Sequence, residues 1–181
     1  ETIEASWALL SPWERRALAQ VSIFRGGFSV HAAELVLAPS APEPDAPSPL
    51  DLLQSLRDKS LLLGDEREAR VRRFTLLASI RELAEAKLDA SQRREAEARH
   101  ARHYLQLGEA LGARLEARDD VEARRELRLE HENFMAVHQR FLARDAPSDL
   151  AGASLRAALV LARSASAYPY AFCLGVLDVA L

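Results

Sequence analysis

Histidines are the residues whose type and spacing come closest to chemistry in this chain. His100 and His103 lie three positions apart on one expected helix, a spacing that two ligands of a metal ion can share. His131 and His138 lie seven positions apart on the next expected helix, on the same broad face as Phe134. A metal site needs further ligands and supporting hydrogen bonds, and no acidic residue at catalytic spacing accompanies these histidines. We therefore predict no metal site and interpret the histidines as solvated or edge-of-core residues.

Other catalytic or cofactor-binding patterns are missing from the sequence. Neither G-x-x-x-x-G-K-[ST] nor G-x-G-x-x-G occurs, and Gly26-Gly27 lacks the lysine and the preceding strand of a phosphate-binding loop. The single cysteine, Cys173, excludes a disulfide within the chain and a cysteine-based metal site. No Ser-His-Asp, Cys-His or paired-carboxylate arrangement stands out among the 27 acidic residues. We expect no enzyme here, no catalytic residue and no cofactor bound by the chain itself.

Arginines near an expected β-hairpin could contact the phosphates of DNA. The candidates for such contacts are Arg57, Arg72 and Arg73. The neighbouring helical segment from Asp51 to Asp58 is acidic at both ends and poor in base-reading residues, and the formal net charge of the chain is -3. We do not expect DNA as a partner of this region, and DNA binding stays the alternative.

Local signals predict the elements of the first half. Ser11-Pro12 is a helix start, because the serine can cap the free amides and proline suits the first helical position. Apolar residues then recur at helical spacing up to Phe24, and Gly26-Gly27 is expected to stop the helix. Ser29 can cap a second helix over residues 31–37.

A proline-rich stretch, residues 38–49, predicts a flexible extended loop. Helical spacing resumes at residues 50–56. Residues 60–63 and 71–76 read as two strands, joined by a polar hairpin tip, and residues 77–88 read as a helix. Helix, turn, helix, helix and hairpin is the element order of a winged helix.

The second half has the pattern of long amphipathic helices. Short turns between them predict an antiparallel helical array, whose last helix has no partner in the chain. The expected helices span residues 92–115, 121–142, 150–165 and 172–181.

Composition places the chain among ordinary soluble proteins, with 49% hydrophobic and 28% charged residues in 181. No apolar stretch approaches the roughly 20 residues that span a bilayer, so no membrane partner is expected. The chain begins at Glu1 instead of Met, and we take it to be a fragment of a longer protein.

Four motifs in fixed order resemble the winged-helix region of bacterial STAND-class signalling ATPases, the large regulators of the LuxR and AfsR kind. The pattern E-x-x-N-L-x-A of these proteins is also similar to Glu130–Ala136, with Phe134 in place of leucine. The four motifs are S-W-x-x-L-x-x-x-E-R from Ser6, F-x-G-G-F from Phe24, L-x-D-K-S-L-L from Leu56 and R-F-x-L-L-x-x-I-R-E from Arg73.

This resemblance implies a regulatory role without catalysis. In such proteins an ATPase domain precedes the winged helix, and a helical, often TPR-like, sensor arm follows it. The resemblance implies ATP or ADP in that upstream domain, which would be one partner of this chain. An unidentified protein or ligand on the helical arm would be the other. It also implies signal transduction or transcription regulation in the bacterial cytoplasm.

One departure from the family concerns nucleotide sensing. Related ATPases carry Met-His-Asp where this chain has Leu76-Leu77-Ala78, which places Leu77 at the histidine position. Leucine cannot donate a hydrogen bond to phosphate. The candidate contacts with a neighbouring domain are Arg73, Leu77 and Arg81. The expected core aromatics are Trp7, Trp13, Phe24, Phe28 and Phe74.

The sequence thus predicts a mainly α chain in two parts. Residues 1–89 would form a winged helix of three helices plus a β-hairpin. Residues 90–181 would begin an antiparallel, TPR-like array that is truncated in this chain. The predicted function is to transmit a signal between the helical arm and the upstream nucleotide-binding domain through protein–protein contacts.

Overall fold

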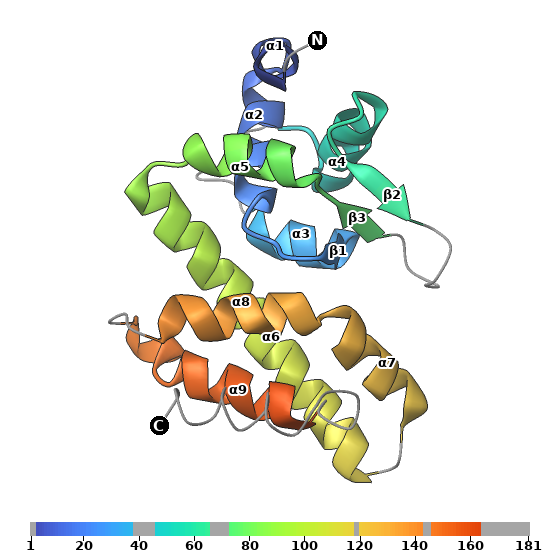
Figure 1. The fold of residues 1–181 in the computed structure, drawn as a ribbon, viewed down its shortest axis with the longest axis vertical. Helices are drawn as coiled ribbons and strands as arrows, with labels where there is room; N and C mark the ends of the chain where they lie inside the picture. The colour runs from blue at the N-terminus through green and yellow to red at the C-terminus, as the bar shows by residue number, and fades with distance from the viewer. Residues whose placement is uncertain (1–2, 38–45, 66–72, 118–119, 143–145, 164–181) are drawn as a thin grey trace. The chain divides into compact units, whose positions relative to one another are not determined.

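The computed structural model describes residues 3–37, 46–65, 73–117, 120–142 and 146–163 (Figure 1). Contacts divide the chain into two compact units, Glu1–His100 and Ala101–Leu181, and the division falls inside one long helix. Most of the predicted proline-rich loop, residues 38–45, lies outside the described residues. The loop ends at Ser48, because Pro49 already begins a helix.

Side-chain caps start three helices of the first unit. Ser11 and Glu14 form a reciprocal capping box, in which the amide of Ser11 donates to the Glu14 carboxylate at 2.7 Å. Ser29 and Ser48 each accept a hydrogen bond from a first-turn amide. The predicted starts at Ser11 and Ser29 are therefore confirmed. The helices are α1 (Ile3–Ala8), α2 (Pro12–Val21), α3 (Val30–Val36), α4 (Pro49–Asp58) and α5 (Ala78–Ala86).

The predicted stop of α2 at Gly26-Gly27 is wrong. The helix ends at Val21, and Gly26 provides a positive φ of 66° in the following turn. The chain must leave the helix this early because Gly27–Ser29 is extended and pairs as strand β1.

The sheet has three antiparallel strands instead of the predicted two. β3 (Arg73–Thr75) lies between β1 and β2 (Leu63–Asp65), so the order is β1-β3-β2. Phe28 of β1 lies opposite Phe74 of β3. The predicted strand over 60–63 begins only at Leu63, since the chain is still leaving α4 at Ser60, whose φ is 59°.

Aromatic packing defines the core of the first unit. Phe24, Phe28 and Phe74 are fully buried, and the rings of Phe24 and Phe28 stack with centroids 4.4 Å apart. The prediction that Trp7 and Trp13 share this core is wrong, because both are only half-buried. Each of the two indole rings instead has a cationic side chain over it.

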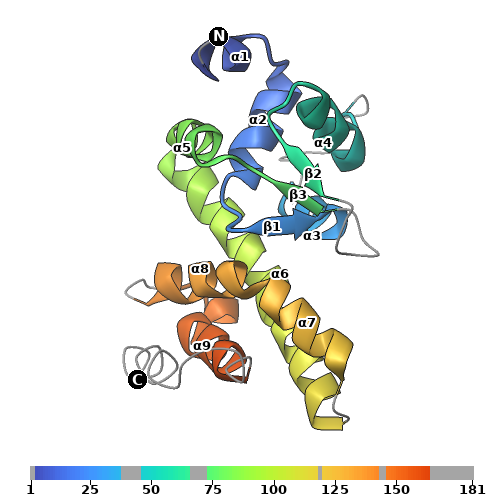
Figure 2. The ribbon, with the colours of Figure 1, turned by 45° about the vertical axis from the view of Figure 1, so that its right-hand side comes forward.

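The second unit consists of packed helices. Helices α8 and α9 lie side by side in both views (Figures 1 and 2). Tyr104 and Leu111 of α6 are buried there, with Phe134 and Val137 of α8. The elements are α6 (Ala90–Ala117), α7 (Val121–Leu129), α8 (His131–Phe141), a short 3-10 turn η1 (Ser148–Leu150) and α9 (Ala153–Arg163).

Two helix predictions for this unit need correction. Residues 121–142 form two helices that meet at Glu130, and this residue is buried. The helix expected from Leu150 begins at Ala153, after Gly152 with its φ of 67°. Residues 172–181 lie outside the described part of the chain.

The coarse prediction of a mainly helical chain with a small antiparallel sheet is confirmed. The finer assignments, winged helix and TPR-like array, stay predictions. Among the described residues, none of the helices is both long enough and apolar enough to cross a bilayer.

Candidate functional site

Arg73 makes its hydrogen bond within the sheet. It is a candidate for contacts with a neighbouring domain or with DNA. It lies on β3 opposite Ser29 and Asp65, and its guanidinium donates to the carbonyl of Gly27 at 2.7 Å. A Cβ on Gly27 would lie 3.3 Å from Nε of Arg73, so glycine leaves room for this side chain across β1. The arginine therefore holds β1 against β3.

Leu77 and Arg81, the other two candidates for a domain contact, differ in exposure. Leu77 is the residue before α5, and its side chain is 49% exposed. Arg81 is half-buried, and its guanidinium donates to the carbonyl of Leu76 at 3.3 Å. Leu77 therefore presents an apolar side chain to solvent, while Arg81 helps to fix the start of α5.

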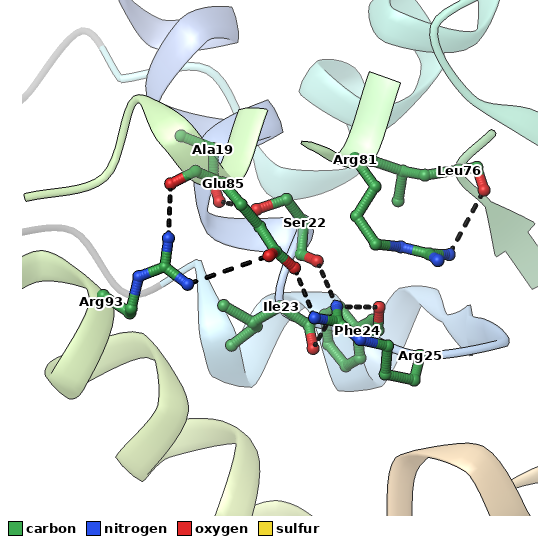
Figure 3. Close-up of polar contacts among 9 residues, drawn as sticks. All are labelled: Ala19, Ser22, Ile23, Phe24, Arg25, Leu76, Arg81, Glu85 and Arg93. Atoms are coloured by element: carbon green, nitrogen blue, oxygen red, sulfur yellow. Dashed lines mark hydrogen bonds and ion pairs between the residues drawn. The ribbon is translucent and has the colours of Figure 1, made fainter. Parts of the chain in front are cut away.

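A polar network next to Arg81 joins three helices (Figure 3). Arg25 follows α2, and its guanidinium lies 2.6 Å from the carboxylate of Glu85 on α5. The same guanidinium donates to the carbonyl of Ser22 at 2.9 Å. Arg93 of α6 donates to the carbonyl of Glu85 at 2.7 Å. No local pattern predicts this network, because Arg25 and Glu85 are 60 positions apart in the sequence.

The candidate DNA contacts do not form a basic surface among the described residues. Arg57 lies on α4, where its guanidinium is 3.3 Å from the carboxylate of Asp58. Arg72 lies outside the described residues. The solvent-exposed residues of α4 include Asp51 and Asp58, and a carboxylate repels phosphate.

An ion pair with a buried carboxylate joins two of the sequence motifs. Glu14 is 6% exposed, and its carboxylate accepts hydrogen bonds at 2.5 Å from both Lys59 and Ser55 of the α4 segment. Burial alone would raise the pKa of Glu14, but the hydrogen bonds from Lys59, Ser55 and Ser11 outweigh it and lower the pKa to about 2. The motif residues Glu14 and Lys59 therefore link α2 to α4, a role that their positions in the sequence do not reveal.

The histidines are more buried than predicted. His100 is fully buried against the ring of Phe24, and His138 is 4% exposed. His138 of α8 shares a hydrogen bond of 2.9 Å with the hydroxyl of Ser154 on α9. Burial lowers the pKa of His131, which favours its neutral form. No group of three metal-ligating side chains occurs in the part of the chain that the structure describes.

A second buried carboxylate organises the other unit. Glu130 accepts hydrogen bonds from the hydroxyl of Tyr104 at 3.0 Å and from the amide of Asn133 at 2.9 Å. All three side chains are buried. The E-x-x-N pattern therefore positions a hydrogen-bonded carboxylate that joins α6 to the junction between α7 and α8.

Comparison with known proteins places similarity in one segment of much longer chains. Over 110 residues, 61% of this chain, the sequence is 36% identical to a protein of Mycobacterium tuberculosis named as a putative HTH-type transcriptional regulator. A protein of Mycobacterium bovis with the same description matches to the same extent. No family model and no solved structure matches the chain. The chain spans about 12% of the length of these relatives. The 36% identity supports a distant relationship with helix-turn-helix transcriptional regulators.

Proposed function

We propose that this chain is a regulatory segment, without catalytic activity, of a longer transcription regulator that works in the bacterial cytoplasm. The observation that carries the proposal is the 36% identity to HTH-type transcriptional regulators over 110 residues. The first unit supports it, because α2, α3 and α4 are followed by the strands β2 and β3, as in a winged helix, and β1 between α2 and α3 completes the antiparallel sheet.

The description of the relatives as HTH-type transcriptional regulators supports a mode in which this chain contacts DNA. In this mode α4 would face the duplex, with Arg57 and Arg72 on the phosphates. The exposed Asp51 and Asp58 oppose base readout, so the contacts would be mainly with the backbone.

Fluorescence anisotropy with a labelled duplex tests this mode through its dependence on salt. The double variant Arg57→Ala/Arg72→Ala should bind about tenfold more weakly, and the slope of log K against log salt should fall by about 2. Arg94→Ala is the matched control, because Arg94 is an exposed arginine on α6. Duplex binding that is absent, or equal in all three proteins, would refute DNA contact by this surface.

The second candidate is coupling to an upstream ATPase domain, which the motif resemblance suggests. The observation that favours it is the 49% exposure of the apolar Leu77 side chain, whereas Arg73 and Arg81 make hydrogen bonds inside the unit. In the full-length regulator, Leu77→Asp should change nucleotide-dependent assembly. Leu159→Asp is the control, because Leu159 has a similar exposed fraction, 48%, on α9. Equal assembly of both variants and the wild type would refute this coupling.

A further inference from the structure

A cavity of about 260 Å³ lies within the first unit, away from the residues discussed for DNA contact. Its walls come from α1, α2, the segment after α5 and the first turns of α6. Neither α4 nor the sheet contributes a residue to it. The cavity is therefore separate from α4, the helix that is proposed to face DNA.

The lining of this cavity is strongly cationic. Four basic side chains line it, and Glu95 is the one acidic residue among them. The local excess of three positive charges contrasts with the formal net charge of -3 for the whole chain. The basic residues are Arg15, Arg16, Lys87 and Arg99.

Two of these cations are held in place by the fold. Arg15 donates from Nε to the carbonyl of Trp7 at 3.2 Å and from its terminal nitrogen to the carbonyl of Ala8 at 2.6 Å. Arg99 donates from Nε to the carbonyl of Val36 at 2.8 Å, and its Nη1 lies 3.8 Å from the carboxylate of Glu95. A guanidinium that is already ordered loses little conformational entropy when an anion binds.

An aromatic wall completes the cavity. The indole of Trp7 lines it, and the ammonium of Lys87 lies 5.8 Å from the ring centroid. Lys87 and Arg16 are exposed to solvent, and the guanidinium of Arg16 lies over the ring of Trp13, 5.0 Å from its centroid.

The geometry points to a binding site for a small phosphorylated molecule in this cavity. Arginine and lysine are the side chains that bind phosphate, the first by paired N–H groups and the second as a point charge. A volume of 260 Å³ suits a small phosphate ester and not the backbone of a duplex, which needs an extended surface. Such a ligand would bridge α1, α2 and α6 and so stabilise the first unit.

Isothermal titration calorimetry of the full chain tests the site with two probes, inorganic pyrophosphate and AMP, at constant ionic strength. We expect saturable binding of at least one probe with Kd below about 1 mM. Stronger binding of pyrophosphate would indicate recognition of phosphate alone, and stronger binding of AMP would indicate that Trp7 contributes. Either preference supports the site.

The double variant Arg16→Gln/Lys87→Gln removes the two exposed cations and keeps the backbone contacts of Arg15 and Arg99. Its affinity should fall about tenfold, whereas Arg94→Gln should bind within about twofold of the wild type. Circular dichroism checks that both variants keep the wild-type melting temperature. Failure of both probes to bind the folded wild type, or equal affinity in both variants, would overturn the proposal. Displacement of pyrophosphate by duplex DNA in the wild type but not in the double variant would also overturn it, in favour of nucleic acid.

Discussion

Replacing Glu14 by glutamine removes the charge of a buried carboxylate while it keeps the shape of the capping residue. Glutamine can still accept the hydrogen bond that closes the capping box with Ser11. The ion pair with Lys59 is lost, and the hydrogen bond from Ser55 becomes weaker because its acceptor no longer carries a charge. The variant therefore isolates the contribution of the negative charge to the link between α2 and α4.

The pKa of Glu14 sets an upper limit for the effect. Burial would raise this pKa, but the hydrogen bonds to the carboxylate lower it from 4.5 to about 2, which corresponds to roughly 3 kcal/mol of unfolding free energy at neutral pH. The Lys59 side chain is 41% exposed, so water and salt screen the pair. We expect Glu14→Gln to lower the free energy of unfolding by about 1–2 kcal/mol at pH 7.

The effect should depend on pH in a defined direction. Because the folded pKa lies below the unfolded value, the charge stabilises the fold fully above about pH 4.5, and this stabilisation is lost as the pH falls towards 2. The difference between wild type and Glu14→Gln should therefore be largest at pH 7 and should shrink by more than half near pH 2.5. Other carboxylates titrate in both proteins and cancel in this difference.

Urea unfolding followed by tryptophan fluorescence measures the effect. The chain has two tryptophans, Trp7 and Trp13, and both lie in the first unit, so the signal reports on that unit. Glu82→Gln is the matched control, because Glu82 is exposed on α5. A loss for Glu14→Gln equal to that of the control, or the same loss at pH 7 and pH 2.5, would refute the reasoning.

Two further predictions concern the second unit and use thermal unfolding followed by circular dichroism. Gly108→Ala should destabilise by about 1–2 kcal/mol, because its Cβ would lie 2.6 Å from a methyl group of Val160, whereas Gly112→Ala should be neutral or stabilising, because its Cβ meets only the flexible Arg163 side chain. Equal melting temperatures of the two variants would contradict the packing of α6 on α9. Tyr104→Phe should cost about 1–2 kcal/mol, because the buried carboxylate that accepts from the phenol loses a donor, and a change below about 0.3 kcal/mol would exclude this role.

The sequence determined the features that depend on neighbours a few positions apart. Ser11, Pro12 and Glu14 specify the start of α2 because the cap, the fixed φ and the reciprocal acceptor lie within four residues. Ser29 specifies the start of α3 in the same way. The apolar spacing also placed Phe24, Phe28 and Phe74 in the core.

Tertiary structure decided the features that depend on residues far apart in the chain. Gly27–Ser29 becomes a strand only because β3, more than 40 positions later, supplies its hydrogen-bond partners, and this pairing ends α2 early. Arg73, a candidate for a binding surface, instead spans β1, since Gly27 has no Cβ in its way.

The contacts of the buried charges also depend on residues that are far apart in the chain. Glu14 lies three positions after Ser11 in the sequence, and only the packing of α4 brings Lys59, 45 positions away, to its carboxylate. The four cations of the proposed phosphate site come from three separate segments, so no local pattern could bring them together. Local capping and periodicity act over one or two turns of chain, whereas burial, ion pairing and strand pairing depend on which distant segments meet when the core forms.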